Sequence, residues 1–394
     1  MKKILIVNNN MKVGGVQKSL HNLLWSMTER YDITLYLFSA EGELARDLPG
    51  NVRVESCISL FRLLGVSQSD CRGRPASWLL RGALAAACRL LGRARVIRLM
   101  ERSQGTLPET YDVAVSYLQN GRPRSFYGGV NEFVLHKVRA KRKVAYLHCD
   151  YARCGADDPA NNGLYASFDA IAACSEGCRQ SFISVVPELA GRCVTAPNFH
   201  RYALIRELAS QDPVSYPEGR VHLLVVGRLA HEKAVDRAIR AAVRCASAGL
   251  LVFLHIVGDG NMRQSLEALV ADLGAQELVR FYGEQANPYR YMPNADLLLV
   301  TSYHEAAPMV IDEARSLGLP VLSVETTSST EMVLDTGCGW VCENSQEGLD
   351  EALLWLLSNR GILEETRARL RGGAPDNARA ERAFRALMGE RDGC

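Results

Sequence analysis

Residues 221–260 read VHLLVVGRLAHEKAVDRAIRAAVRCASAGLLVFLHIVGDG. The apolar run 221–226 is rich in Val and Leu and predicts a buried strand. A helical pattern follows at 234–246, and a second apolar run at 250–257 predicts another buried strand. This order of strand, helix and strand is typical of two parallel strands joined by a right-handed crossover.

The same alternation extends over both halves of the chain, and it predicts an α/β protein with two Rossmann-like domains, each built on a parallel sheet. Toward the C-terminus, helices are expected at 262–273 and 308–317, and strands at 279–282, 297–300 and 320–324. The N-terminal half repeats the pattern with a helix at 17–29 and with strands at 3–7, 33–38, 113–116, 143–147 and 170–173.

Polar and Pro-containing sequence interrupts the alternation at 198–220, and 394 residues are more than one hydrophobic core usually serves. We therefore expect an N-terminal domain at 1–200 and a C-terminal domain at 201–375. Residues 60–106 break the rhythm of the first domain and predict a helical insertion. The tail at 376–394 is helical and charged, and its pattern leaves open which domain it covers.

Charge is distributed unevenly between the two halves. Residues 1–200 carry 26 Lys and Arg against 17 Asp and Glu, whereas residues 201–394 carry 20 against 27. Nine arginines fall within 60–102, and seven Lys and Arg within 122–143. A basic half favours an acidic partner, such as an anionic membrane surface or a phosphorylated acceptor. A solvated basic surface is the alternative, because the arginines after position 80 do not share one helical face.

The 12 cysteines include no Cys-x-x-Cys pair, so we expect reduced, mostly buried thiols of a cytosolic protein. Only four apolar residues follow the initial Met-Lys-Lys, which is too short for a signal peptide. Five arginines interrupt the apolar-rich segment 78–100, so no bilayer-spanning helix is predicted.

Several loops that follow strands carry residues suited to an anionic ligand. Gly14-Gly15 opens the first helix, where glycine permits close approach and helix-start amides attract an anion. The loop lacks the third glycine of Gly-x-Gly-x-x-Gly, which disfavours a nicotinamide-dependent dehydrogenase. Gly258 lies in a similar turn after the strand at 250–257. Arg228 and Lys233 follow the strand at 221–226, and two cations there suit a diphosphate, although a solvated loop fits the composition as well.

Residues 302–313 read SYHEAAPMVIDE and form the most informative group. Pro308 suits the first position of a helix because it lacks an N–H. Glu305 then lies in the loop, and Glu313 lies about a turn and a half into the helix. A carboxylate beside the anion site of a helix start is reasonable where it accepts hydrogen bonds from neutral hydroxyls, as a sugar and a ribose supply. The simpler interpretations are an exposed helical Glu313 and a capping charge at Glu305.

These elements, in this order, resemble the retaining glycosyltransferases of family 4, whose GT-B fold has two Rossmann-like domains facing across a cleft. The resemblance covers nearly the whole chain. This sequence departs from the family at Ala306-Ala307, where many members have Gly-Phe, and at Ala234, where glycine is frequent. The segments that carry the resemblance are 168–177, Pro197-Asn198, Gly227–Lys233, Val257–Gly260, Asn287-Pro288-Tyr289 and the pair Glu305/Glu313.

The resemblance implies a role for each matching residue. Arg228 and Lys233 would neutralise the donor diphosphate, and Glu305 would hold the donor sugar. Glu313 would bind the ribose, and His148, after the strand at 143–147, would approach the sugar from the N-terminal domain. The catalytic set is then His148, Arg228, Lys233 and Glu305, and the substrate-binding set is Gly14, Gly15, Gly258, Ala306, Ala307, Pro308, Met309, Val310 and Glu313.

The reaction that the resemblance implies is transfer of a hexose from a nucleoside diphosphate sugar to a glycan or lipid-linked glycan, with retention, in bacterial surface polysaccharide synthesis. No Asp-x-Asp is present, so no metal and no cofactor beyond the donor are expected. A nucleic-acid partner is not expected either, because no known binding module is recognisable. We expect a cytoplasmic protein, and we hypothesise that its basic surface docks on anionic lipid at the inner face of the membrane.

Two other functions remain open on the sequence. A nucleotide-sugar epimerase of the same fold would convert the donor without an acceptor. A non-catalytic scaffold would bind the nucleotide-sugar and transfer nothing, although the intact set of Arg228, Lys233, Glu305 and Glu313 argues against it.

Overall fold

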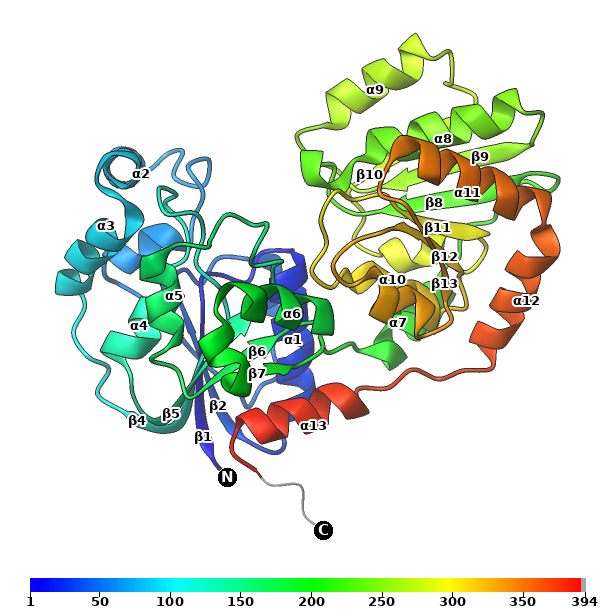
Figure 1. The fold of residues 1–394 in the computed structure, drawn as a ribbon. Coiled ribbons are helices and arrows are strands. Elements are labelled where there is room, and N and C mark those ends of the chain that lie inside the picture. Colours follow the sequence, from blue (N-terminus) through cyan, green and yellow to red (C-terminus); the bar gives the residue numbers. More distant parts are fainter. Residues whose placement is uncertain (391–394) are drawn as a thin grey trace. The chain divides into compact units, whose positions relative to one another are not determined.

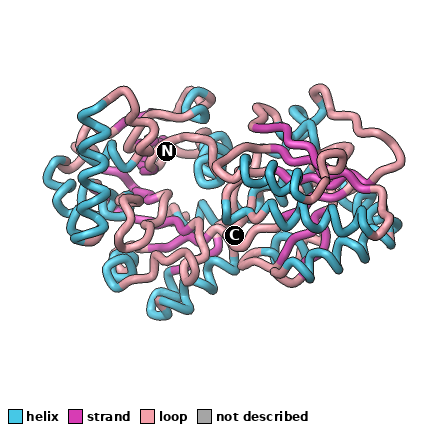
Figure 2. The backbone as a smooth tube through the Cα atoms, turned by 90° about the horizontal axis from the view of Figure 1, so that it is seen from above, coloured by secondary structure: helices cyan, strands magenta, loops and turns pink. Residues whose placement is uncertain are grey.

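Parallel strands form the centre of two separate units in the computed structural model, which describes residues 1–390 (Figure 1). The first unit comprises residues 1–199 together with the described tail residues 377–390, and the second comprises 200–376. Strands lie in the interior of each unit with helices around them (Figure 2). The predicted class, two α/β units on parallel sheets, is confirmed. The last four residues of the predicted helical tail, 391–394, lie outside the described residues.

The N-terminal sheet has seven strands within the described residues, in the order β3-β2-β1-β4-β5-β6-β7, and its pairs are all parallel. Parallel sheets are covered on both faces, which explains the continuous apolar run of β1. The strands are β1 (Lys3–Asn8), β2 (Asp32–Leu37), β3 (Arg53–Ser56), β4 (Thr110–Ser116), β5 (Arg139–Leu147), β6 (Ala170–Ala173) and β7 (Cys193–Thr195).

The helices of this unit include the chain's last one, α13 (Ala378–Leu387). Its Phe384 packs against the rings of Tyr31 and Phe199, so the tail belongs to the N-terminal core. The other helices are α1 (Gly15–Met27), α2 (Pro75–Leu91), α3 (Arg93–Met100), α4 (Val130–Lys137), α5 (Pro159–Tyr165) and α6 (Glu176–Val185).

The insertion between β3 and β4 carries α2 and α3, which pack against each other. Arg93 fixes them to the unit: its side chain is 2% exposed and donates to Glu132 Oε1 at 2.7 Å and to Asn161 Oδ1 at 2.5 Å. Asn120 Nδ2 donates to the same two residues. A buried arginine needs such partners, so one of the nine arginines counted in the sequence is internal rather than part of a basic surface.

The C-terminal sheet has six strands within the described residues, in the order β10-β9-β8-β11-β12-β13, and its pairs are parallel throughout. Its strands are β8 (Val221–Val226), β9 (Val252–Val257), β10 (Val279–Gly283), β11 (Leu297–Val300), β12 (Val321–Val324) and β13 (Gly339–Cys342). The helices are α7 (Tyr202–Ser210), α8 (Val235–Ser247), α9 (Arg263–Asp272), α10 (Met309–Ser316), α11 (Gln346–Ser358) and α12 (Arg360–Arg371).

Three strands were not predicted, and each has a local cause. β3 reads RVES and is mostly exposed at the sheet edge, so it has no buried apolar run. β7 has three residues, and β13 is half-buried at the other sheet's edge. The prediction for Pro308 was wrong by one position: it is the N-cap of α10, with extended ψ, and the helix begins at Met309.

All eleven cysteines within residues 1–390 are free thiols. Among the same residues, no helix combines the length and the hydrophobicity that a segment crossing a bilayer needs.

Candidate functional site

Two glycine-containing loops of the C-terminal unit cross in direct backbone contact at the ends of β8 and β9. Leu229 N donates to Asp259 O at 2.9 Å. A Cβ on Gly258, whose φ is +136°, would lie 1.9 Å from the carbonyl oxygen of Gly227. Only glycine therefore fits at position 258, because a side chain would clash with the Gly227 carbonyl. The crossing also fixes where the loop that carries Arg228 leaves the sheet.

Lys233 and Glu305 meet at the carboxyl ends of β8 and β11. Lys233 Nζ donates to Glu305 Oε1 at 2.5 Å, and Ser302 Oγ donates to the same oxygen at 2.6 Å. The Glu305 side chain is 11% exposed and that of Lys233 is 31% exposed. Glu305 Oε2 makes no hydrogen bond with any residue that the structure describes, so this oxygen remains available to a ligand hydroxyl.

A small pocket lies at this pair, at the edge of the sheet where ligands of open α/β folds bind. Its lining combines the two cation positions with the start of α10. The residues are Val225, Val226, Gly227, Arg228, Lys233, Val235, Leu299, Val300, Thr301, Ser302, Glu305 and Val310.

Arg228 is 71% exposed and donates to Glu232 Oε1 at 2.9 Å. An exposed pair of this kind contributes about 0–1 kcal/mol, so a phosphate can replace Glu232 at little cost. The structure thus brings four predicted residues to one pocket of one unit: Arg228, Lys233, Glu305 and Val310.

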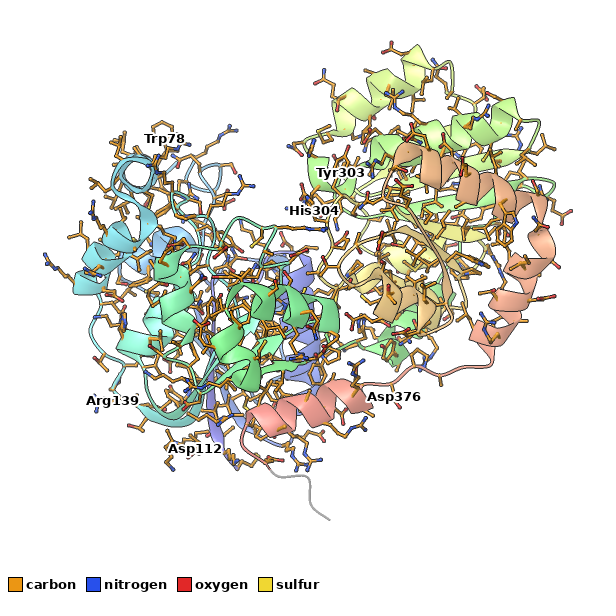
Figure 3. The ribbon with its side chains drawn as sticks, viewed as in Figure 1. Trp78, Asp112, Arg139, Tyr303, His304 and Asp376 are labelled. Atoms are coloured by element: carbon orange, nitrogen blue, oxygen red, sulfur yellow. The ribbon has the colours of Figure 1, made fainter. Side chains whose placement is uncertain are left out.

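The loop from 301 to 304 is tied to the loop of Lys233 by contacts that sequence reasoning missed. Thr301 Oγ1 donates to the carbonyls of Lys233 and Ala234 at 3.1 and 3.0 Å, and Tyr303 N donates to Glu232 O at 2.9 Å. Tyr303, labelled in Figure 3, also lies under the Arg237 guanidinium at 4.4 Å from the ring centroid. These contacts fix the loop that precedes Glu305 against the loop that carries Lys233.

Ala234, which departs from the family's frequent glycine, adopts φ +46° and ψ 46°. This left-handed conformation costs an L-residue about 1–2 kcal/mol, which explains why glycine suits the position. The two hydrogen bonds from Thr301 help to hold the turn here.

Helix α10 presents its first turn to the pocket through Val310. Glu313 is buried at 3% exposure, so the simpler interpretation as an exposed helical glutamate is wrong. The next residue back, Asp312, faces other partners, His200 and Arg315. Burial raises the pKa of Asp312, but the neighbouring His200, 3.3 Å away, and Arg315 outweigh the effect of burial and leave the pKa lowered. Ala306, Ala307, Pro308 and Met309 precede Val310 on the same segment.

The other predicted residues belong to the N-terminal unit. Gly14 is the N-cap of α1 and Gly15 its first residue, so both lie at the helix start as expected. His148 follows β5 and packs against two rings: it is tilted on Tyr117 and stacked on Tyr146, with ring centroids 4.8 and 5.7 Å away. Its Nε2 is shielded from water and has no hydrogen-bond partner in the described part of the chain. Burial lowers the pKa of His148 to about 3, so the ring is neutral at physiological pH.

Within residues 1–390, no group of three His, Cys, Asp or Glu side chains is arranged to hold a metal ion. The pocket's charged groups are one carboxylate and two cations, a set that suits a phosphate and a hydroxyl.

Comparison with known proteins relates this geometry to a family. Residues 209–376 match the family model described as Glycosyl transferases group 1. Over these residues, which are less than half of the chain, the C-terminal unit is similar to a group 1 glycosyltransferase domain. The matched residues contain the Lys233–Glu305 pocket and α10.

Curated relatives match over part of their length. The chain is 37% identical to the lipopolysaccharide glucosyltransferase WaaG of Escherichia coli K12 over 134 residues, which are 33% of this chain and 36% of WaaG. It is 27% identical to the lipopolysaccharide core biosynthesis glycosyltransferase LpsE of Rhizobium meliloti over 169 residues, 43% of this chain and 45% of LpsE. The matches thus span about a third to half of these relatives.

Solved structures match over almost the whole chain. The complex of Anabaena Alr3699/HepE with UDP-glucose has a TM-score of 0.68 at 18% identity and covers 99% of this chain and all of that one. The structure of WaaG has a TM-score of 0.60 at 20% identity, with 98% and 100% covered. At these identities the likeness concerns the fold, which is the two-domain fold of glycosyltransferases with parallel sheets.

Proposed function

We propose that this chain is a metal-independent hexosyltransferase that moves a sugar, with retention, from a nucleoside diphosphate sugar to a glycan or lipid-linked glycan. The observation that carries the proposal is the Lys233–Glu305 pair beside Arg228 and the start of α10 in one pocket. HepE, of the same fold, has been crystallised with UDP and with UDP-glucose, which supports such a donor.

The donor's two ends find matching partners around the pocket. Lys233 has three N–H donors and uses one on Glu305, so it can also hold a phosphate oxygen. Arg228 exchanges Glu232 for the diphosphate, and the dipole of α10 adds attraction for the same charge. Glu305 Oε2 accepts a hydrogen bond from a sugar hydroxyl. The buried carboxylate of Glu313 binds the ribose hydroxyls.

The chemistry breaks the bond between the anomeric carbon and the β-phosphate oxygen and forms one from that carbon to the acceptor oxygen. The acceptor's hydroxyl proton passes to the departing phosphate oxygen on the same face, which accounts for retention. Negative charge that develops on the leaving diphosphate is stabilised by Arg228, Lys233 and α10, and no metal is needed for that task. We assign to His148 of the N-terminal unit the role of an uncharged hydrogen-bonding partner for the donor sugar, because its ring is neutral.

For the acceptor, we propose a lipid-linked glycan of bacterial surface polysaccharide synthesis, reached at the inner face of an anionic membrane. Support comes from the similarity to WaaG and LpsE, which are enzymes of lipopolysaccharide synthesis, and from the basic N-terminal half. The chain would then work in the cytoplasm, where nucleotide-sugars are made.

Product analysis tests the reaction. The protein is incubated with a panel of nucleotide-sugars and a lipid-linked oligosaccharide extract, with a chelator present throughout. Sugar incorporation that equals nucleoside diphosphate release, with the donor's anomeric configuration kept in the product's NMR spectrum, is the expected result. A changed sugar without an acceptor would show an epimerase, and binding without any product would show a scaffold.

A further inference from the structure

The outer face of α2 is apolar, which is the reverse of an ordinary surface helix. Its inward face buries Leu84 and Cys88. The opposite face consists of Leu79, Ala83, Ala86 and Leu90, all exposed, at the spacing that places residues on one side of a helix. Leu79 is 63% exposed and Leu90 is 82% exposed. The described residues of this unit therefore leave an apolar helical face uncovered.

Further large side chains widen this face. Trp78 is 46% exposed and lies on the outer side of α2 in Figure 3. Leu80 and Leu91 are exposed along one border of the stripe, and Leu99 is exposed on α3. Tryptophan is a side chain of the water–bilayer boundary, because its ring is apolar and its N–H is polar.

Positive charge surrounds the apolar face. The sequence has no acidic residue between Asp70 and Glu101. Arg81 is directed inward, where its guanidinium donates to Val66 O and Gln68 Oε1, and Arg93 is in the buried ion pair with Glu132. Arg74 is exposed and pairs with Glu41 at 3.1 Å. The other exposed arginines of α2, α3 and the flanking residues are Arg72, Arg89, Arg95, Arg98 and Arg102.

Charge distinguishes between two partners that could cover this apolar face, a second copy of the chain and a lipid bilayer. A second copy docking on the same face through a two-fold axis would bring two arginine-rich borders together, and like charges at an interface oppose binding. A bilayer with anionic headgroups matches both the apolar face and the arginines, because the leucines can insert at its acyl boundary and the arginines can bind its phosphates. The exposed Arg89 within α2 fits a helix that lies in the plane of the boundary rather than across the bilayer.

We propose that α2 is an interfacial helix that inserts Leu79, Ala83, Ala86 and Leu90 into an anionic bilayer, with the exposed arginines on lipid phosphates. The Arg93–Glu132 pair ties α3 to α4, and α2 packs on α3, so the helix is already formed before it meets the membrane. This deepens the proposed function by naming the element that docks, and it rests on that function for the identity of the acceptor.

Vesicle flotation tests the proposal directly. The full chain is floated with phosphatidylcholine vesicles that contain or lack phosphatidylglycerol, alongside Leu79→Glu/Leu90→Glu. A matched control is Leu251→Glu, at another exposed leucine of 61% exposure in the C-terminal unit. The expected result is flotation with anionic vesicles, a partition coefficient at least about tenfold lower in the double variant, and no change in the control. Trp78 fluorescence should shift to the blue on binding and lose that shift in Trp78→Phe.

Equal flotation of the double variant and the wild type would overturn the proposal, and so would wild-type protein that stays with the unbound fraction. A concentration-dependent dimer that the double variant abolishes would overturn it in favour of a second copy. Nucleotide-induced thermal shifts of the same variants separate this proposal from the proposed function. If nucleotides still shift the melting temperature but the protein does not float, the membrane proposal fails and the donor site stands. If the protein floats but no nucleotide shifts the melting temperature, the membrane proposal stands and the proposed function fails.

Discussion

Lys233 and Glu305, 72 residues apart in the sequence, form a 2.5 Å ion pair at the edge of the C-terminal sheet. Glu305 holds the lysine that the donor diphosphate would need, so carboxylate and phosphate would share the three N–H donors of one ammonium group. The pair therefore serves two purposes: it pre-positions the cation, and it keeps a carboxylate in the pocket for a sugar hydroxyl.

Glu305→Gln separates these two purposes. Without the carboxylate, Lys233 is released to phosphate, so the affinity for a nucleoside diphosphate should rise severalfold, by about 1 kcal/mol or less. Turnover should fall by about 100-fold, because a contact to the reacting sugar is weakened. Titration calorimetry and an assay of diphosphate release measure the two effects.

Glu232→Gln is the matched control for that variant, since Glu232 pairs with the exposed Arg228. It should keep turnover within about threefold of the wild type. Equal losses in both variants would mean that Glu305 has no special contact with the donor.

Gly258→Ala tests the crossing of the two loops. The new Cβ would meet the Gly227 carbonyl at 1.9 Å, so either the loop of Arg228 moves or the chain unfolds more easily. We expect a loss of about 2–4 kcal/mol in the free energy of unfolding by urea. Gly249→Ala is the control: its φ is also positive, at +83°, but its Cβ has open space, so it should lose about 1 kcal/mol. Equal losses would show that the backbone angle, and not the contact, decides.

Arg93→Met should destabilise the N-terminal unit by about 3–5 kcal/mol, because it leaves Glu132 buried without its cation. Arg95→Met, two residues away and exposed, should change the free energy of unfolding by less than about 0.5 kcal/mol. Thermal unfolding of the two variants side by side provides the measurement. Similar melting temperatures would contradict the role of Arg93 as an internal anchor.

His148 predicts a pH dependence of stability. Its pKa is about 3 in the folded chain, below the ordinary value of about 6.5 that applies when unfolded. The unfolded state therefore takes up a proton first, and the contribution of the neutral ring is complete above pH 6.5 and is lost as the pH falls toward 3. Between pH 7 and pH 5 this loss should be about 1–2 kcal/mol. His148→Phe, which keeps the ring contacts with Tyr117 and Tyr146, should flatten the dependence in urea titrations, and an unchanged slope would contradict a neutral His148 ring in the folded state.

Much of the fold was readable from the sequence because buried parallel strands appear as apolar runs. The stretch 221–260 became β8, α8 and β9 as expected. The strands β3, β7 and β13 escaped because they are short or polar edge strands, and only pairing with a neighbour makes them strands. Periodicity does not report such pairing.

The candidate site was readable in part. Three of its residues could be predicted because they are charged and follow strand ends, where ligands of open α/β sheets bind: Arg228, Lys233 and Glu305. Thr301, Ser302 and Tyr303 did not, because their contribution is a set of contacts to another loop. The outer face of α2 was missed for a related reason: the sequence shows an amphipathic helix but not which of its faces the core covers.

The most direct test of the donor site is a thermal-shift panel with UDP, GDP, ADP and CMP and their common sugars, without added metal. The wild type is compared with Lys233→Ala and Glu313→Ala, and with Lys141→Ala, an exposed lysine of the N-terminal unit, as control. The account predicts a rise in melting temperature with one nucleotide family, lost in the first two variants and kept in the control. No rise with any nucleotide, or a rise that survives Lys233→Ala and Glu313→Ala, would contradict the donor site in the C-terminal unit.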